Sequence, residues 1–204
     1  MRRRPLIAGV VLAALAAAAG VLVYKAVASG PPGSPAPRYR VTLREARKAS
    51  FPVYYPGDVV AGLPLTTIIR SHNAGPVPDI DFIYGDCTGA DSCAPPLEVQ
   101  VWPTCARNLA VYATTTAPVP VPQAAAPVPA TVREVPAAFL EDSRRLEIQT
   151  GISTIVIFAE NREQALQVAD SLRGLNVDVG PRVPLPQPPP HALAGKLTCD
   201  GLDR

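Results

Sequence analysis

Residues 146–174, LEIQTGISTIVIFAENREQALQVADSLRG, decide the fold because two hydrophobic periods follow each other within them. Apolar or β-branched residues alternate with polar ones from Leu146 to Thr150, which predicts a half-buried strand. The run 155–159, IVIFA, is continuous and rich in β-branched residues, which predicts a central strand covered on both faces. Thr150-Gly151 is expected to supply the tight turn between them, so the two strands form a hairpin.

A helix is predicted to follow this hairpin. Asn161, with Gln164 three residues later, forms a capping-box pattern at the helix start. Gly174 occupies the position of a C′ glycine after the helix end. Between them a single apolar stripe has helical spacing; it consists of Ala165, Leu166, Val168, Ala169 and Leu172. The stretch therefore predicts a β-β-α unit.

Shorter patterns complete the predicted fold. Thr42 and Glu45 form a second capping box, which predicts a short helix that ends before Pro52. Further strands are predicted over 65–69, 82–84 and 97–102. Together these elements predict an α+β fold: a small mixed or antiparallel sheet with helices packed on one face, after an N-terminal transmembrane helix.

The N-terminal segment predicts the location of the chain. Residues 6–24 carry no charge, follow three consecutive arginines, and would span about 28 Å as a helix, close to the hydrocarbon thickness of a bilayer. We expect a signal-anchor helix over 6–28, because the h-regions of cleaved signal peptides are shorter, at about 7 to 15 residues. The alternative is a signal peptide cleaved after Ala28, at the motif Ala26-Val27-Ala28.

The arginines at positions 2–4 predict the topology. Because basic residues close to a span favour the cytoplasmic side, residues 1–5 are expected in the cytoplasm and the rest of the chain beyond the membrane. Basic residues after the span oppose this orientation without reversing it. The predicted location is therefore the cell membrane, single-pass, with an extracytoplasmic body that is secreted if the leader is cleaved.

Proline-rich stretches divide the rest of the chain. Residues 29–38 form a Pro/Gly linker, 117–136 a Pro-rich loop, and 181–204 a Pro-rich tail. Proline lacks an amide donor, so these stretches are not expected to form helices or central strands. The extracytoplasmic α+β domain is placed at 39–180.

The charge of the body excludes one class of function. The whole chain has a net charge of +2, but residues 29–204 carry 15 basic and 17 acidic residues. A nearly neutral body offers no basic footprint for nucleic acid. The chain contains 16 Arg against 3 Lys and is rich in Ala and Pro, a composition typical of GC-rich bacterial genomes. The predicted partners are the lipid bilayer, through residues 6–28, and an envelope protein or glycan.

The four cysteines predict disulfides if the body lies outside the cytoplasm. We favour a bond between Cys87 and Cys93, which closes a small loop, and a bond between Cys105 and Cys199, which pins the Pro-rich tail. A zinc site requires closely spaced pairs of cysteines, and a redox enzyme requires a C-x-x-C motif; the chain contains neither pattern. We therefore predict no metal and no cofactor.

Four aspartates crowd the region that precedes Cys93, namely Asp79, Asp81, Asp86 and Asp91. Their spacing does not match the oxygen ligands of an EF-hand calcium loop. Since aspartate favours turns for backbone reasons, turn chemistry is the preferred interpretation.

A hydrolase is the alternative function. Of the two histidines, His191 lies in the tail and His72 in a loop-like stretch after a strand. The G-x-S-x-G motif of a nucleophile elbow is missing from the sequence, and Ser153 lies on a predicted strand. A hydrolase would have to use His72 or a pair of carboxylates, and no catalytic residue is assigned.

The candidate binding residues are aromatic. Tyr54 and Tyr55 lie between two prolines, and Trp102 is expected on the polar side of its strand. Exposed Tyr and Trp can bind a sugar ring, a peptide or a partner surface. The alternative is that the tyrosines cover the edge of the core and that Trp102 packs under the Pro-rich loop. The sequence thus predicts an anchored envelope protein with a disulfide-stabilised binding or structural domain.

Overall fold

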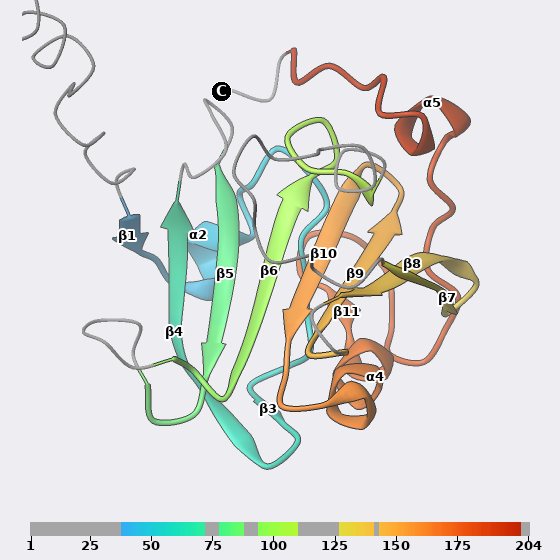
Figure 1. Ribbon diagram of the computed structural model, residues 1–204. Coiled ribbons are helices and arrows are strands. Elements are labelled where there is room, and N and C mark those ends of the chain that lie inside the picture. The colour runs from blue at the N-terminus through green and yellow to red at the C-terminus, as the bar shows by residue number, and fades with distance from the viewer. Residues whose placement is uncertain (1–37, 72–77, 88–93, 110–126, 141–142, 201–204) are drawn as a thin grey trace, which may run out of the picture. The chain divides into compact units, whose positions relative to one another are not determined.

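A computed structural model describes residues 38–71, 78–87, 94–109, 127–140 and 143–200 (Figure 1). The expected membrane segment 6–28 and nearly all of the linker lie outside these ranges, as do His72, Asp91 and Cys93. In the part of the chain that is described, no helix is long and apolar enough to cross a bilayer.

The described residues form one broad antiparallel sheet with the strand order β1-β4-β5-β6-β10-β9-β8-β7 (Figure 1). Short β3 pairs with β4 beside this path, and β2 pairs with β11 in a separate ribbon. The strands are β1 (Arg38–Arg40), β2 (Tyr54–Tyr55), β3 (Val59–Val60), β4 (Leu63–Ser71), β5 (Asp79–Tyr84), β6 (Leu97–Pro103), β7 (Val128–Val132), β8 (Val135–Leu140), β9 (Arg145–Thr150), β10 (Ser153–Phe158) and β11 (Arg173–Gly174). The helices are α2 (Leu43–Ala46), α4 (Arg162–Ser171) and α5 (Pro190–Leu193).

The antiparallel sheet is as predicted, but the fold is mostly β rather than a balanced α+β. Two of the three described helices contain four residues each. The expected loop at 117–136 is the main source of the difference, because β7 and the first residues of β8 lie within it. β7 is at the edge of the sheet, where a strand tolerates Pro129 because one side of its backbone needs no partner. Pro136 lies just before the pairing of β8 with β9 begins at Ala137.

The β-β-α unit is confirmed. β9 and β10 pair antiparallel from Thr150–Ser153 onward, so the two-residue turn consists of Gly151 and Ile152. α4 begins after Asn161, whose side chain accepts a hydrogen bond from the amide of Gln164 at 3.0 Å. The predicted C′ role of Gly174 is wrong: α4 ends at Ser171 and Gly174 pairs in β11.

The second predicted helix is present as α2. Thr42 and Glu45 exchange both hydrogen bonds of a capping box, with 2.7 Å between the Thr42 amide nitrogen and Glu45 Oε2. The backbone amide and the hydroxyl of Thr42 hold the pKa of Glu45 below its usual value. Ala46 is buried, so this single turn packs against β4 and contributes to the core.

The sheet has two different buried faces. Because side chains alternate along a strand, one face carries the apolar residues of β5, β6, β9 and β10, which pack against Ala165, Val168 and Ala169 of α4. The opposite face carries polar residues that are also buried, which the alternating pattern did not predict. These are Asp79 and Asp81 of β5, Glu147 and Gln149 of β9, and Thr154 of β10.

The tail from Pro181 to Pro190 is not a free spacer. Although it has no regular secondary structure before α5, the amide of Leu185 donates to the carbonyl of Arg133 at 3.0 Å. The carbonyl of Pro186 accepts from the amide of Gly151 and from the hydroxyl of Thr150. The tail therefore lies across the β7–β8 and β9–β10 turns; we call residues 181–200 the strap.

Arg133 joins the strap to the sheet and to α4. It occupies the β7–β8 turn, where both central residues have positive φ, as a two-residue turn of type I′ requires. Its guanidinium donates to four carbonyls, those of Ala169, Leu172, Gly180 and Val183, at 2.6–3.3 Å. The first two belong to the C-terminal end of α4, where carbonyls lack partners within the helix.

We expect Arg133→Lys to lower the free energy of unfolding by about 2–3 kcal/mol. Lysine keeps the positive charge, but its single ammonium group cannot donate to all four carbonyls. The measurement is chemical denaturation with the disulfides intact. Glu134→Gln is the control, since Glu134 occupies the same turn with an exposed side chain, and we expect a loss below about 0.5 kcal/mol. Equal stability of the two variants would show that the guanidinium does not hold the strap.

Candidate functional site

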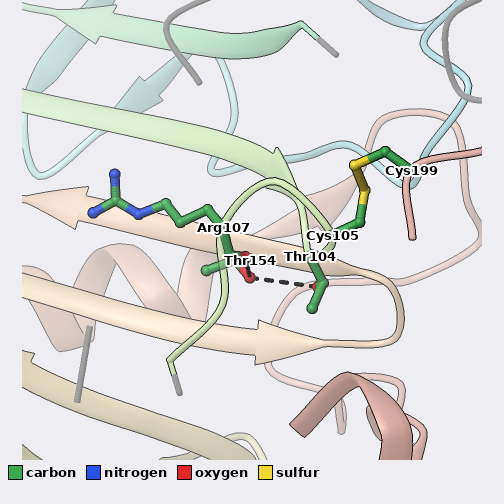
Figure 2. Close-up of a disulfide and its surroundings, with 5 residues drawn as sticks. All are labelled: Thr104, Cys105, Arg107, Thr154 and Cys199. Atoms are coloured by element: carbon green, nitrogen blue, oxygen red, sulfur yellow. Dashed lines mark hydrogen bonds between the residues drawn. A yellow bond between two sulfur atoms is a disulfide. The ribbon is translucent and has the colours of Figure 1, made fainter. Parts of the chain in front are cut away.

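A disulfide joins the strap to the turn that follows β6. Cys105 and Cys199 are bonded, with 5.3 Å between their Cα atoms and a separation of 94 positions in sequence (Figure 2). This is the predicted pairing. Cys87 is also disulfide-bonded, and Cys93, the partner predicted for it, lies outside the described residues.

The turn that carries Cys105 also directs Arg107 over the polar face of the sheet. The amide of Arg107 donates to the carbonyl of Pro103 at 3.1 Å, which closes the turn. The hydroxyl of Thr154 donates to the carbonyl of Arg107 at 2.6 Å, which fixes the turn to β10. Figure 2 shows the consequence: Cys105 faces the strap, whereas the Arg107 side chain extends away from the disulfide.

Arg107 forms a buried ion pair with Glu147. Its Nη2 lies 2.6 Å from Glu147 Oε1, and Arg145 Nε lies 3.3 Å from the same oxygen. The Glu147 side chain is fully buried and that of Arg107 is 10% exposed. The Arg107 guanidinium also stacks over the ring of Trp102, at 5.3 Å from its centroid. A carboxylate on this face is therefore neutralised by two arginines.

Further polar groups extend the same face across neighbouring strands. Trp102 Nε1 donates to Gln100 Oε1 at 3.0 Å, and Gln100 Nε2 donates to Glu98 Oε1 at 2.7 Å. On β4 and β5, the Ser71 hydroxyl donates to Asp79 Oδ2 at 2.6 Å. These side chains are committed to one another, which is typical of a network that orders a structure rather than of groups held ready for a substrate.

Gln149 is the exception on this face. Its side chain is fully buried, and neither its amide nitrogen nor its amide oxygen has a hydrogen-bond partner. Such a group costs about 1–3 kcal/mol when it is unsatisfied. Gln149 is opposite Thr154 in the β9–β10 pairing, so its amide lies in the same region as Arg107 and Trp102.

The aromatic residues proposed for binding are not gathered on an exposed surface. Tyr54 and Trp102 are buried, at 1% and 5% exposure, and they lie on different strands, β2 and β6. Tyr55 is half-buried and packs against Phe82, with ring centroids 5.6 Å apart. Trp102 is on the polar side of its strand, as expected, but its indole N–H is used by Gln100. The burial of Tyr54 agrees with the alternative in which the tyrosines contribute to the core.

The aspartate cluster is also not what the sequence indicated. Asp79 and Asp81 lie within β5 and are buried, whereas turn chemistry had been expected for them. Asp86 is exposed after the strand end. Among the residues that the structure describes, no three His, Cys, Asp or Glu side chains are close enough to hold a metal ion.

The residues considered for hydrolysis that the structure describes are exposed or already have structural partners. His191 is exposed on α5, and the Ser153 hydroxyl donates to the carbonyl of Pro52 at 2.6 Å. His72 lies outside the described ranges. Glu147, the buried carboxylate of β9, forms ion pairs with Arg107 and Arg145.

Two open grooves are present elsewhere on the body. One, of about 450 Å³, is lined by residues of β4 and by Gly85, Asp86, Cys87 and Pro96. The other, of about 590 Å³, lies between Pro95–Pro96 and the start of α4, with Arg144 and Glu160 in its lining. Neither groove is lined by a nucleophilic side chain together with a general base.

Comparisons with known proteins bring no further assignment. Neither a protein-family model, nor a curated protein, nor a solved structure matches this chain.

We expect a double-mutant cycle on the ion pair to show strong coupling. Glu147→Gln and Arg107→Met should each lower the free energy of unfolding by about 3 kcal/mol, because each removes one partner of a buried charge pair. The double variant should lose at least about 1 kcal/mol less than the sum of the single losses. Thermal and chemical unfolding measure these values. Additive losses would show that the two side chains do not act as a pair.

Proposed function

We propose that the chain is a single-pass, N-terminally anchored protein of the bacterial cell envelope, whose disulfide-bonded β domain faces outward and binds or organises another envelope component. The observation that carries this proposal is the disulfide between Cys105 and Cys199. Stable disulfides form in oxidising compartments and are rare in the cytoplasm. None of the cysteines in the described ranges is free.

The N-terminal sequence supports the same compartment. An uncharged stretch of 19 residues after three arginines has the length and the flanking charge of a signal anchor. A Pro/Gly linker then separates this stretch from the first strand, β1. Leader and disulfide are independent features, and both support a body that crosses the membrane.

Binding or organisation is preferred to catalysis because the buried nucleophile and carboxylate candidates in the described ranges have structural partners. Ser153, Asp79 and Glu147 each have a structural partner. The burial of Trp102 removes it from any exposed docking surface. The domain is therefore proposed to present a surface rather than a reactive pocket.

Cell fractionation with mass spectrometry of the N-terminus tests the anchor. We expect the chain in the membrane fraction with residues 1–28 intact, resistant to extraction by alkaline carbonate and released by detergent. A mature N-terminus at Ser29 in the medium would support the cleaved, secreted alternative. Recovery of the intact chain in the cytosol would contradict the proposal.

The disulfide that holds the strap should dominate stability. By the chain-entropy relation, Cys105→Ser with Cys199→Ser should lower the free energy of unfolding by about 4–5 kcal/mol, because this bond closes a long loop. Cys87→Ser with Cys93→Ser is the matched control, for which the shorter loop predicts a loss of about 2 kcal/mol. Mass tagging of free thiols under denaturing, non-reducing conditions should detect none in the unaltered chain. Equal losses in the two variants, or four free thiols, would contradict the assignment.

A further inference from the structure

One edge of the body carries an exposed concentration of positive charge. It lies where the chain enters the sheet: β1 is the terminal strand, α2 follows it directly, and β4 pairs with β1 (Figure 1). Five basic residues on these elements or directly after α2 are exposed, and one of them, Arg47, also donates from Nε to the carbonyl of Leu175 at 3.0 Å. We call them the basic surface, and they are Arg40, Arg44, Arg47, Lys48 and Arg70.

The register and the helix place these charges along one edge of the sheet, on both of its faces. Tyr39 pairs with Arg70 and Arg40 pairs with Ile69, so Arg40 and Arg70 lie one position apart at the same end of adjacent strands, on opposite faces of the sheet. Arg44 and Lys48 are four residues apart, which places them on one side of α2 and its C-terminal turn. α2 packs against β4, the strand that carries Arg70.

Little negative charge opposes the basic surface locally. Glu45 is the one acidic residue between positions 38 and 48, and its carboxylate is held by Thr42. On the neighbouring strand β5, Asp79 and Asp81 are buried. The surface charge at this edge is therefore strongly positive.

The body as a whole is electrically polarised. Residues 38–48 carry five basic residues and one acidic residue, a net charge of +4. The remaining residues of 29–204 carry 10 basic and 16 acidic residues, a net charge of −6. Near an anionic surface, this charge distribution orients the molecule so that the edge with the basic surface is attracted and the rest of the body is repelled.

We propose that the basic surface binds the anionic headgroups of the bilayer in which the leader is anchored, so that the β domain is seated on the membrane in one orientation. This inference rests on the proposed anchor. A tether of at most about 3.6 Å per residue from Tyr24 to Arg38 keeps the body within about 50 Å of the membrane, which raises the effective concentration of headgroups at the basic surface. Each basic residue close to an anionic membrane contributes roughly a fivefold increase in binding.

Lys48 can report the contact between the basic surface and the membrane, with Lys196 as an internal reference. The chain's three lysines are Lys25 in the leader, Lys48 in the basic surface and Lys196 in the strap. Lys48 and Lys196 are both exposed. A membrane-impermeant acylating reagent therefore labels each at a rate that depends on its access to solvent, and mass spectrometry measures the ratio within one molecule.

The experiment uses the full-length chain in vesicles of phosphatidylcholine alone or of an equal mixture of phosphatidylcholine and phosphatidylglycerol. Labelling of Lys48 relative to Lys196 should slow by about fivefold or more in the mixed vesicles. It should recover in about 1 M salt, where the Debye length is about 3 Å. An unchanged ratio in the two membranes would overturn the proposal.

Matched variants keep Lys48 as the reporter. Arg44→Gln with Arg70→Gln removes two charges from the basic surface and should restore most of the Lys48 labelling. Arg144→Gln with Arg182→Gln removes two exposed charges elsewhere and should leave the slow labelling unchanged. If the first pair keeps the slow labelling, or the second abolishes it, the basic surface is not the contact.

Vesicle flotation separates this inference from the anchor. On phosphatidylcholine vesicles the leader alone should hold the chain, so failure to float there would contradict the proposed anchor. The labelling ratio on mixed vesicles reports the basic surface independently, because electrostatic binding does not require the leader.

Discussion

The disulfide between Cys105 and Cys199 joins two irregular segments of the chain. On one side is an irregular turn at the end of β6, and on the other is a proline-rich strap that cannot build its own backbone hydrogen bonds. The bond fixes the far end of the strap, while Arg133 and the β9–β10 turn hold its middle. The same β6 turn directs Arg107 to Glu147. The disulfide therefore holds the strap across the turns at the end of the sheet. It also fixes the β6 turn that places Arg107 beside Glu147 on the polar face.

The elements that the sequence predicted are those whose signal is local. The alternation at 146–150, the β-branched run at 155–159 and the capping residues Thr42 and Asn161 each specify their own geometry, and all of them appear in the structure. The pairing of Cys105 with Cys199 followed from the need to hold a chain of prolines. The β7–β8 hairpin was missed because Pro129 and Pro136 argue against strands, and the sequence does not show which strand lies at an edge.

The polar face was missed for a different reason. Alternation tells which residues share a face of a strand, but it does not tell whether that face meets solvent. The alternation in β9 predicts that Glu147 and Gln149 are exposed, but both side chains are fully buried. Asp81, which was expected in a turn, is buried within β5 on the same face. Knowledge of what packs on the second face is tertiary information, and the local pattern does not contain it.

The disulfides, the anchored domain and the membrane-facing basic surface all depend on the compartment in which the body lies. The most direct measurement is a pair of reporters fused after Arg204 in cells. Alkaline phosphatase, which needs disulfides to become active, should be active in the fusion, and green fluorescent protein, which fluoresces when it folds in the cytoplasm, should be dark. A fluorescent fusion with an inactive phosphatase would place the body inside the cell and contradict the account.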